Sequence, residues 1–322
     1  MEYREFGHTG WKVSAIGTGT WAMGSLWGAV KEADSLAALN RALDLGVNFF
    51  DTADVYGSEH LLGKLRKSRS EPFFIATKLG MQVNPDPGGY TRRNMTAFVE
   101  SSLRQLQVDA IDLIQLHCPP IAVYNSDTFR ILDDLVAQGK IRFYGVSVER
   151  IVEAKKALEF PGVQSVQMIF NIFRQRPIED FFPLARQHKV GIIARVPLAS
   201  GLLSGKMTPG TTFASDDHRS FNREGAEFDK GETFSGVDYE TGLQAVEEIR
   251  SLVPPGASMA QMALRWILMF PAVSCAIPGA KRPAQVEDNV HAADLPPLTE
   301  ATMQKMRGIY DQSIRPQVHQ LW

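Results

Sequence analysis

The stretch VNFFDTADVYGSEHLLGKLRKSRSEPFFIATK (47–78) decides the fold. It contains two short apolar runs, 47–52 and 73–78, separated by a helical stretch, His60–Lys67. A strand with one face in water alternates apolar and polar residues, whereas these runs are almost continuously apolar. Such runs are typical of parallel strands that are covered on both faces. The stretch therefore predicts a strand–helix–strand unit of a parallel sheet.

The same alternation extends along the chain. Eight apolar runs are expected to form strands, at 13–17, 47–52, 73–78, 111–117, 141–147, 163–170, 190–196 and 273–278. Amphipathic stretches between them are expected to form helices, at Glu32–Leu45, His60–Lys67, Arg92–Leu106, Asp127–Gln138, Arg150–Leu158, Ile178–His188 and Ala284–His291. Eight strands alternating with helices in 322 residues predict an α/β fold, a (β/α)8 TIM barrel. Because no change of composition divides the chain, residues 1–322 are expected to form one domain.

Three segments depart from this repeat. The stretch EYREFGHTGWKV (2–13) has a turn signal at His8–Gly10 between two β-prone runs, so we expect a hairpin that plugs the bottom of the barrel. The segment Gly201–Asp238 is rich in Gly, Ser, Thr and charge. A long loop of this kind is a lid over a bound cofactor, a partner contact, surface decoration or a disordered segment. Ser258–Phe270 is apolar at helical spacing and predicts a packed helix with Ser258 as its cap.

The composition bounds the partners and the compartment. Hydrophobic residues make up 44% and charged residues 22% of the chain, as in a soluble globular protein. A formal charge of −2 gives no general attraction to nucleic acid or to an anionic membrane. The start of the chain lacks the apolar core of a signal peptide, and two cysteines, Cys118 and Cys275, suit a reducing compartment. We therefore expect a cytoplasmic protein without nucleic-acid or membrane partners, and leave a monomer or a homo-oligomer open.

Four side chains are expected at one rim of the barrel. Catalytic groups of this fold lie at the carboxyl ends of strands. Asp51 and Lys78 end the second and third expected strands, His117 ends the fourth, and Tyr56 lies in the loop after Asp51. A lysine beside a phenol favours phenolate, so Lys78 is expected to lower the pKa of Tyr56, and Asp51 to keep Lys78 charged.

This set predicts carbonyl reduction. Tyr56 would give a proton to a carbonyl oxygen while a hydride reaches the carbon, and His117 would orient that oxygen. Each residue alone also has a structural explanation: Asp51 as a loop cap, Lys78 as its buried partner, and His117 as a hydrogen-bonded core residue. Their joint arrival at strand ends favours the catalytic interpretation.

The stretch GVNFFDTADVYGSE (46–59) resembles the signature of the aldo-keto reductases. The blocks LIQLH (113–117), IRFYGVS (141–147), PLASGLLSGK (197–206) and AIPGAKRPAQVEDN (276–289) resemble further blocks of that family, in the family's order. The resemblance covers nearly the whole chain. It implies a catalytic tetrad of Asp51, Tyr56, Lys78 and His117, and a nicotinamide dinucleotide that lies extended across the barrel mouth.

The resemblance also implies a set of cofactor contacts. Ser147 and Gln167 match residues that bind the carboxamide, Val148 replaces the usual Asn, and Arg195 stands where many members stack an aromatic ring on the nicotinamide. Lys281 and Arg282, at the start of a helix, provide charge for a 2′-phosphate and favour NADPH over NADH, although a solvated surface is the alternative. The full expected set is Gly19, Thr20, Trp21, Asp51, Ser147, Gln167, Arg195, Pro197, Leu198, Ala199, Gly201, Leu202, Ser204, Lys206, Gly279, Lys281, Arg282, Gln285, Asp288 and Asn289.

The substrate side and the competing functions complete the predictions. Trp21 and Trp27, with Tyr56, His117 and Tyr124, are expected to wall a site for a small carbonyl compound or a sugar. Cys118 has no second pair of ligands at metal spacing, so no metal site is expected. The tail 311–322 is expected to anchor to the barrel. Two alternatives stay open, namely a cofactor-binding regulatory subunit with little turnover and a Schiff-base aldolase with Lys78 as the nucleophile.

Overall fold

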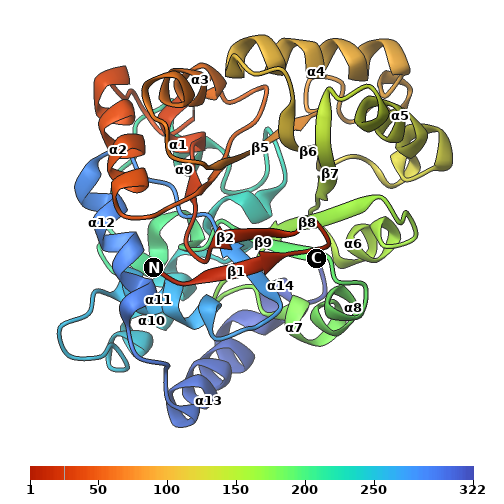
Figure 1. Ribbon diagram of the computed structural model, residues 1–322. Coiled ribbons are helices and arrows are strands. Elements are labelled where there is room, and N and C mark those ends of the chain that lie inside the picture. The colour runs from red at the N-terminus through yellow and green to blue at the C-terminus, as the bar shows by residue number, and fades with distance from the viewer. Residues whose placement is uncertain (25) are drawn as a thin grey trace.

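Eight parallel strands form a nearly closed barrel in the computed structural model, which describes residues 1–24 and 26–322 (Figure 1). In the order in which they pair, the strands are β3 (Thr18–Gly19), β4 (Phe49–Asp51), β5 (Phe74–Leu79), β6 (Ile111–His117), β7 (Ile141–Ser147), β8 (Val163–Ile169), β9 (Gly191–Arg195) and β10 (Val273–Ala276). Single parallel bridges, Ile16 with Ala276 and Gly19 with Gly279, join the two edges of the sheet. The predicted barrel is confirmed.

The amino-terminal hairpin fills the bottom of the barrel, as predicted. Strands β1 (Tyr3–Phe6) and β2 (Trp11–Ser14) pair antiparallel and cross the centre of the ring of helices in Figure 1. Phe6 and Val13 are fully buried and pack in one cluster with Phe49 and other side chains of the barrel interior. The hairpin therefore closes one end of the barrel and leaves the carboxyl ends of the strands as the open end.

The expected first strand at 13–17 is wrong in its bounds. Val13 and Ser14 belong to the hairpin, and the first barrel strand, β3, begins only at Thr18. The apolar run is buried throughout, first in the hairpin and then against β10. Periodicity cannot separate two elements that are both buried, so the run appeared as one strand.

Helices cover the outside of the barrel. Those between or after the strands are α2 (Glu32–Asp44), α3 (Glu59–Ser68), α4 (Arg92–Leu106), α5 (Ser126–Ala137), α6 (Ile151–Ala157), α7 (Arg176–Asp180), α8 (Phe182–Gln187), α11 (Met259–Leu268) and α12 (Pro283–His291). The helix expected at 178–188 is split into α7 and α8. Pro183 at the start of α8 has no N–H to continue the ladder of hydrogen bonds, and the backbone turns at Phe181 (φ −133°).

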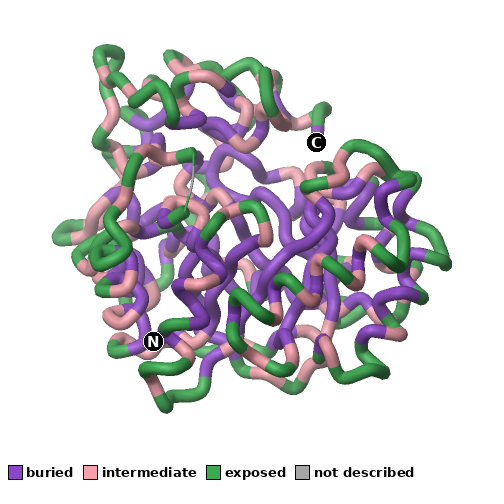
Figure 2. The backbone as a smooth tube through the Cα atoms, turned by 90° about the horizontal axis from the view of Figure 1, so that it is seen from above, coloured by how far each residue is buried: buried purple, intermediate pink, exposed green. Residues whose placement is uncertain are grey.

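The remaining helices extend the carboxyl-terminal half. Ser258 caps α11, because its hydroxyl accepts a hydrogen bond from the Gln261 amide at 3.1 Å, as predicted. Helices α10 (Tyr239–Arg250), α13 (Glu300–Ile309) and α14 (Arg315–Val318) were not expected, and two single turns, α1 (Trp21–Gly24) and α9 (His218–Phe221), lie in loops. Figure 2 shows the buried backbone gathered in the barrel, with exposed residues confined to the periphery. No described helix is both long and apolar enough to cross a membrane.

Candidate active site

A cleft of about 930 Å³ lies at the carboxyl ends of the strands. Residues of the loop 201–238 form part of its wall, so this segment lies over the barrel mouth. Of the residues expected to bind a cofactor or substrate, those that line the cleft are Gly19, Trp21, Trp27, Asp51, Tyr56, His117, Gln167, Arg195, Pro197, Leu198, Gly201, Ser204, Lys206, Gly279, Lys281 and Gln285.

A buried ion pair lies at the floor of the cleft. Asp51 is the last residue of β4, and Lys78 lies near the end of the neighbouring strand β5. The Lys78 Nζ donates to Asp51 Oδ1 at 2.5 Å and to the Thr52 carbonyl at 2.8 Å. The Gln167 amide donates to the other carboxylate oxygen at 2.7 Å. Because the Lys78 and Asp51 side chains are only 1% and 4% exposed, each charge is stabilised mainly by the other.

Tyr56 and His117 lie above this pair. The Lys78 Nζ is 4.9 Å from the centroid of the Tyr56 ring, and the His117 ring lies 5.7 Å from the same ring at 82°. The His117 Nδ1 is buried and has no hydrogen-bond partner among the described residues. The structure thus brings together all four residues that the sequence predicted at one rim.

The pKa values differ from the prediction for Tyr56. Burial raises the pKa of Tyr56 well above 10, and the Asp51 and Glu232 carboxylates raise it further. The expected net lowering of this pKa is therefore wrong, because burial and the two carboxylates outweigh the positive charge that acts in the opposite direction. Burial, with the cations of Lys78 and Arg195, lowers the pKa of His117 well below 6.5. At neutral pH the site holds a protonated phenol and a neutral imidazole.

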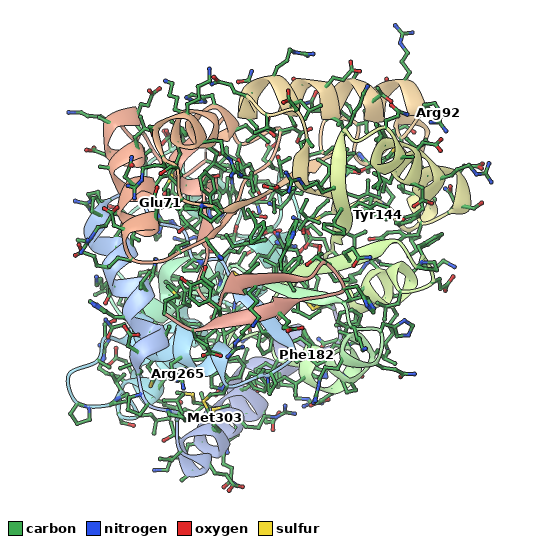
Figure 3. All side chains as sticks on the ribbon, viewed as in Figure 1. Glu71, Arg92, Tyr144, Phe182, Arg265 and Met303 are labelled. Carbon is green, nitrogen blue, oxygen red and sulfur yellow. The ribbon has the colours of Figure 1, made fainter. Side chains whose placement is uncertain are left out.

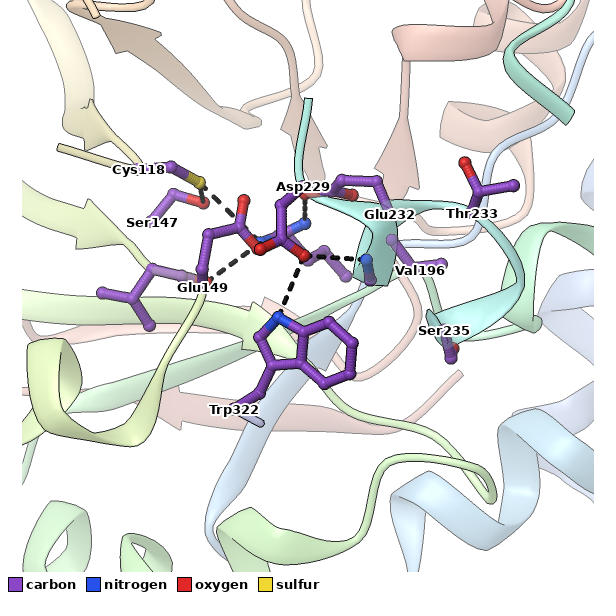
Figure 4. A network of polar contacts seen from close by, with 12 residues as sticks. Cys118, Ser147, Glu149, Val196, Asp229, Glu232, Thr233, Ser235 and Trp322 are labelled. Carbon is purple, nitrogen blue, oxygen red and sulfur yellow. Dashed lines mark hydrogen bonds and ion pairs between the residues drawn. The ribbon is translucent and has the colours of Figure 1, made fainter. Parts of the chain in front are cut away.

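Arg195 forms part of the wall beside Tyr56 and His117. Its Nη2 donates to the Val148 carbonyl at 2.9 Å and to Glu149 Oε2 at 3.0 Å, and its Nη1 pairs with Glu232 of the loop 201–238. Figure 4 shows Glu149 and Glu232 facing each other in this network. Sequence reasoning missed both carboxylates. Their only signal was position: Glu149 follows the end of β7, and Glu232 lies in the loop after β9.

One cluster near Arg195 has the residue types of a metal site. Ligand atoms of Cys118, Glu149 and Glu232 lie within 4.8 Å of one another. The Arg195 guanidinium hydrogen-bonds both carboxylates, and its Nη2 lies 3.8 Å from the Cys118 sulfur. Arg195 is thus the cation that these groups surround.

Several expected cofactor contacts do not line the cleft. Asp288 accepts hydrogen bonds from Ser258 at 3.0 Å and Gln261 at 2.8 Å, and so ties α12 to the start of α11. Thr20 donates to the Asp51 carbonyl at 3.0 Å, below the cleft surface. The others are Ser147, Ala199, Leu202 and Asn289, which are buried, and Arg282, which is exposed at the start of α12.

Two loops meet across the cleft at its other end. Trp27 and Asp217 form an antiparallel bridge, and the His218 amide donates to the Leu26 carbonyl at 3.0 Å. The Lys281 Nζ hydrogen-bonds the Trp27 carbonyl. The loop after β3 and the loop 201–238 are therefore joined across the cleft.

Aromatic side chains wall the cleft beside the tetrad. The Trp21 ring stacks 5.9 Å from the Tyr56 ring and meets the Trp27 ring edge-on at 5.4 Å. Tyr124 was also expected here, but it is buried against Phe129 away from the cleft wall. The lining residues that sequence reasoning missed include five apolar residues in loops without a motif, Leu26, Val55, Met81, Phe221 and Phe228.

Comparisons with known proteins agree with this architecture. The sequence model of the Aldo/keto reductase family matches residues 15–311. The aldo-keto reductase YhdN of Bacillus subtilis (strain 168) is 34% identical over 297 residues, which cover 89% of this chain and 87% of the relative. A probable voltage-gated potassium channel subunit beta of Arabidopsis thaliana is 29% identical over 329 residues, 96% of each chain.

A solved structure of an enzyme has the same fold. The glycerol dehydrogenase AKR11B4 from Gluconobacter oxydans superposes with a TM-score of 0.80 at 31% identity, covering 97% of this chain and 96% of that one. The family match spans most of the chain, and its relatives include named oxidoreductases. The chain therefore belongs to the aldo/keto reductase family and is an enzyme of that class.

Proposed function

We propose that this protein reduces aldehydes or ketones to alcohols with NADPH, and catalyses the reverse reaction, with Tyr56 as the proton donor and acceptor. The observation that carries the proposal is the convergence of Asp51, Tyr56, Lys78 and His117 at one end of the cleft. Any one of these residues has a structural explanation. A buried ion pair, a phenol and an unpartnered imidazole nitrogen beside one cavity are the parts that carbonyl reduction needs.

Each residue has a separate task in the proposed reaction. Bound NADPH supplies the hydride that reaches the carbonyl carbon. Tyr56 gives its proton to the carbonyl oxygen, and its raised pKa keeps that proton on the phenol at neutral pH. His117, neutral at this pH, donates an N–H to the same oxygen and orients it. Lys78, held by Asp51, places a fixed positive charge beneath the phenol, where negative charge develops as the proton leaves.

The residues of the cleft fit a phosphorylated dinucleotide. Lys206 and Lys281 line the cleft, and Arg282 stands at the start of α12. The Arg282 side chain does not cap the amino terminus of α12. Pro283 has no N–H and the Gln285 N–H bonds the Arg282 carbonyl, so the Ala284 N–H is the donor of the first turn that would meet an anion. These three cations would hold phosphate groups, and Gln167 would hold the carboxamide. The Arg195 Nε, which is buried and has no partner among the described residues, provides a further donor.

The wall of the cleft supports a neutral carbonyl substrate. Trp21, Trp27 and Phe228 present apolar faces, whereas the charges nearest to Tyr56 are engaged with one another. Small aldehydes, ketones and sugars in their open forms fit this chemistry, and the glycerol dehydrogenase among the similar structures adds polyols as substrates of the reverse reaction. The two cysteines are free thiols, and on that ground we propose a cytoplasmic enzyme. We further propose that it acts on small molecules, as a monomer or a homo-oligomer, without nucleic-acid or membrane partners, since a formal charge of −2 gives no general attraction to either.

The test is an assay of NADPH consumption with a panel of aldehydes, ketones and sugars, and of NADP⁺ reduction with the matching alcohols. Turnover that depends on both the cofactor and one class of carbonyl supports the proposal. A protein that binds NADPH but oxidises it only once, and slowly, with every carbonyl would support the second candidate, a regulatory subunit, which the potassium channel relative favours. Borohydride trapping of a substrate on Lys78 would support an aldolase, against which the Lys78–Asp51 pair argues, because it keeps the amine protonated.

A further inference from the structure

Three charged side chains form a buried group that the proposed reaction does not use, and we call Arg195, Glu149 and Glu232 the Arg195 triad. They come from β9, from the residue two after β7, and from the loop 201–238. Their side chains are 9%, 17% and 13% exposed. One guanidinium pairs with two carboxylates that also line the cleft, so the ionised triad has a net charge of −1.

The charges next to the triad do not cancel this excess. Asp229 and Arg174 are the further charged groups that act on Glu149, and they carry opposite signs. The Trp322 indole joins them: it donates to Asp229 Oδ1 at 2.9 Å (Figure 4). The Arg174 guanidinium lies 3.9 Å from the Trp322 ring. The Cys118 thiol beside the triad is neutral, because burial raises its pKa well above 9. Lys78 and Asp51, on the other side, also pair with each other.

The triad acts on the place where hydride is exchanged. Arg195, Glu149 and Glu232 line the same cleft as Tyr56, and two of these charges act on the pKa of its phenol, which Glu232 raises and Arg195 lowers. The substrate oxygen that takes the Tyr56 proton is bonded to the carbonyl carbon that takes the hydride. That carbon and the nicotinamide carbon that gives the hydride must approach to about 3–3.5 Å. Charges that act on Tyr56 therefore act on the nicotinamide ring as well.

The two oxidation states of that ring differ in charge. The oxidised ring is positively charged and the reduced ring is neutral. A lone Arg195 would disfavour the oxidised form, because like charges repel. The structure adds two carboxylates to it and reverses the sign of the local charge.

We propose that the Arg195 triad stabilises the oxidised form of the bound cofactor relative to the reduced form, and so shifts the enzyme towards alcohol oxidation. This inference rests on the proposed function, since it needs a nicotinamide in the cleft. Burial raises the pKa of Glu149 to about 7, with further contributions from Glu232 and Asp229, whereas Arg195 lowers it. The net negative charge is consequently complete above neutral pH, and the preference should be largest there.

The test compares binding rather than turnover. The dissociation constants of NADP⁺ and NADPH are measured by fluorescence titration at pH 8.5 for the native protein and for the variants E232Q and E149Q, which keep the shape of the side chain and remove one charge. E224Q is the matched control, because Glu224 lies in the same loop, is exposed and does not line the cleft. Thermal unfolding of each variant verifies that it is folded.

The ratio of the two constants, NADP⁺ to NADPH, is expected to rise about tenfold in E232Q and in E149Q, since one unit charge a few ångströms away is removed from a low-dielectric site. A tenfold change corresponds to a rise of about 30 mV in the midpoint potential of the bound couple. E224Q should leave the ratio unchanged, because its charge is screened by water.

Three results would overturn the proposal. A ratio that stays within twofold of the native value in both variants would mean that the charges of Glu149 and Glu232 do not favour the oxidised form of the cofactor. A parallel loss of affinity for both forms makes Glu232 a latch of the loop instead. A native protein that binds neither form overturns this inference together with the proposed function, whereas native binding of both forms with an unchanged ratio in the variants leaves the proposed function standing.

Discussion

Replacing Lys78 by Met should destabilise the protein much more than the same replacement at its surface. The Asp51 carboxylate would then stay buried with only the amides of Gln167 and Gln115, at 2.7 and 3.4 Å, as partners. Removing one member of a buried ion pair costs about 3–5 kcal/mol, because the other charge is left uncompensated. The free energy of unfolding, measured by urea denaturation followed by circular dichroism, should fall by that amount.

The chain provides a matched control for this prediction. Lys64 pairs with Glu32 at the same 2.5 Å, but their side chains are 47% and 49% exposed. K64M should therefore cost less than about 1 kcal/mol. The double variant D51N/K78M should recover part of the loss in K78M, since no charge then remains buried. Equal losses of unfolding free energy in K78M and K64M would refute the argument that burial makes the Lys78–Asp51 pair matter more than the exposed Lys64–Glu32 pair.

Two further predictions follow from other charged groups. Burial, with the nearby Glu59, raises the pKa of Asp54 from 3.8 to about 7. Between these two pH values the folded protein keeps the Asp54 proton, whereas the unfolded chain has lost it. The free energy of unfolding therefore falls as the pH rises from 3.8 to about 7. D54N should accordingly gain stability on the order of 3 kcal/mol at pH 8 and nothing at pH 3, and a gain that is independent of pH in thermal or urea unfolding would contradict this cause. The double variant K281M/R282M should raise the dissociation constant of NADPH about tenfold or more and leave that of NADH nearly unchanged, because only NADPH carries the 2′-phosphate; equal weakening of both in titrations would place the 2′-phosphate elsewhere.

The barrel was predictable from the sequence because its signals are local. Strands buried on both faces are apolar throughout, and the helices between them begin and end at recognisable residues, such as Ser258 at the start of α11. The bounds failed where burial removed the periodicity, in the run at 13–17, and where Pro183 split a helix. Helices α10 and α13 were missed although both are amphipathic, because neither is followed directly by an expected strand that would mark it as part of the repeat: α10 is followed by the helix α11, and no expected strand comes after α13.

The site was predictable to the extent that it depends on strand ends. Asp51, Lys78 and His117 meet because parallel strands carry their last residues to one rim. The direction of the Tyr56 pKa was not predictable, since it depends on burial and on Glu232, which is 176 positions away in a loop. The partners of Arg195 were hidden for the same reason. Pairings between a strand end and a distant loop leave no spacing in the sequence that could be recognised.

The proton carried by Tyr56 is the centre of the account, and Y56F tests it most directly. The variant keeps the ring, and with it the stacking on Trp21 and the contact with His117, and removes only the hydroxyl. Its dissociation constant for NADPH should stay within about threefold of the native value. With NADPH bound and a carbonyl substrate in excess, the rate of a single turnover, followed by the loss of NADPH absorbance, should fall by a factor of about 10² to 10⁴. A single-turnover rate equal to that of the native protein would contradict the central claim.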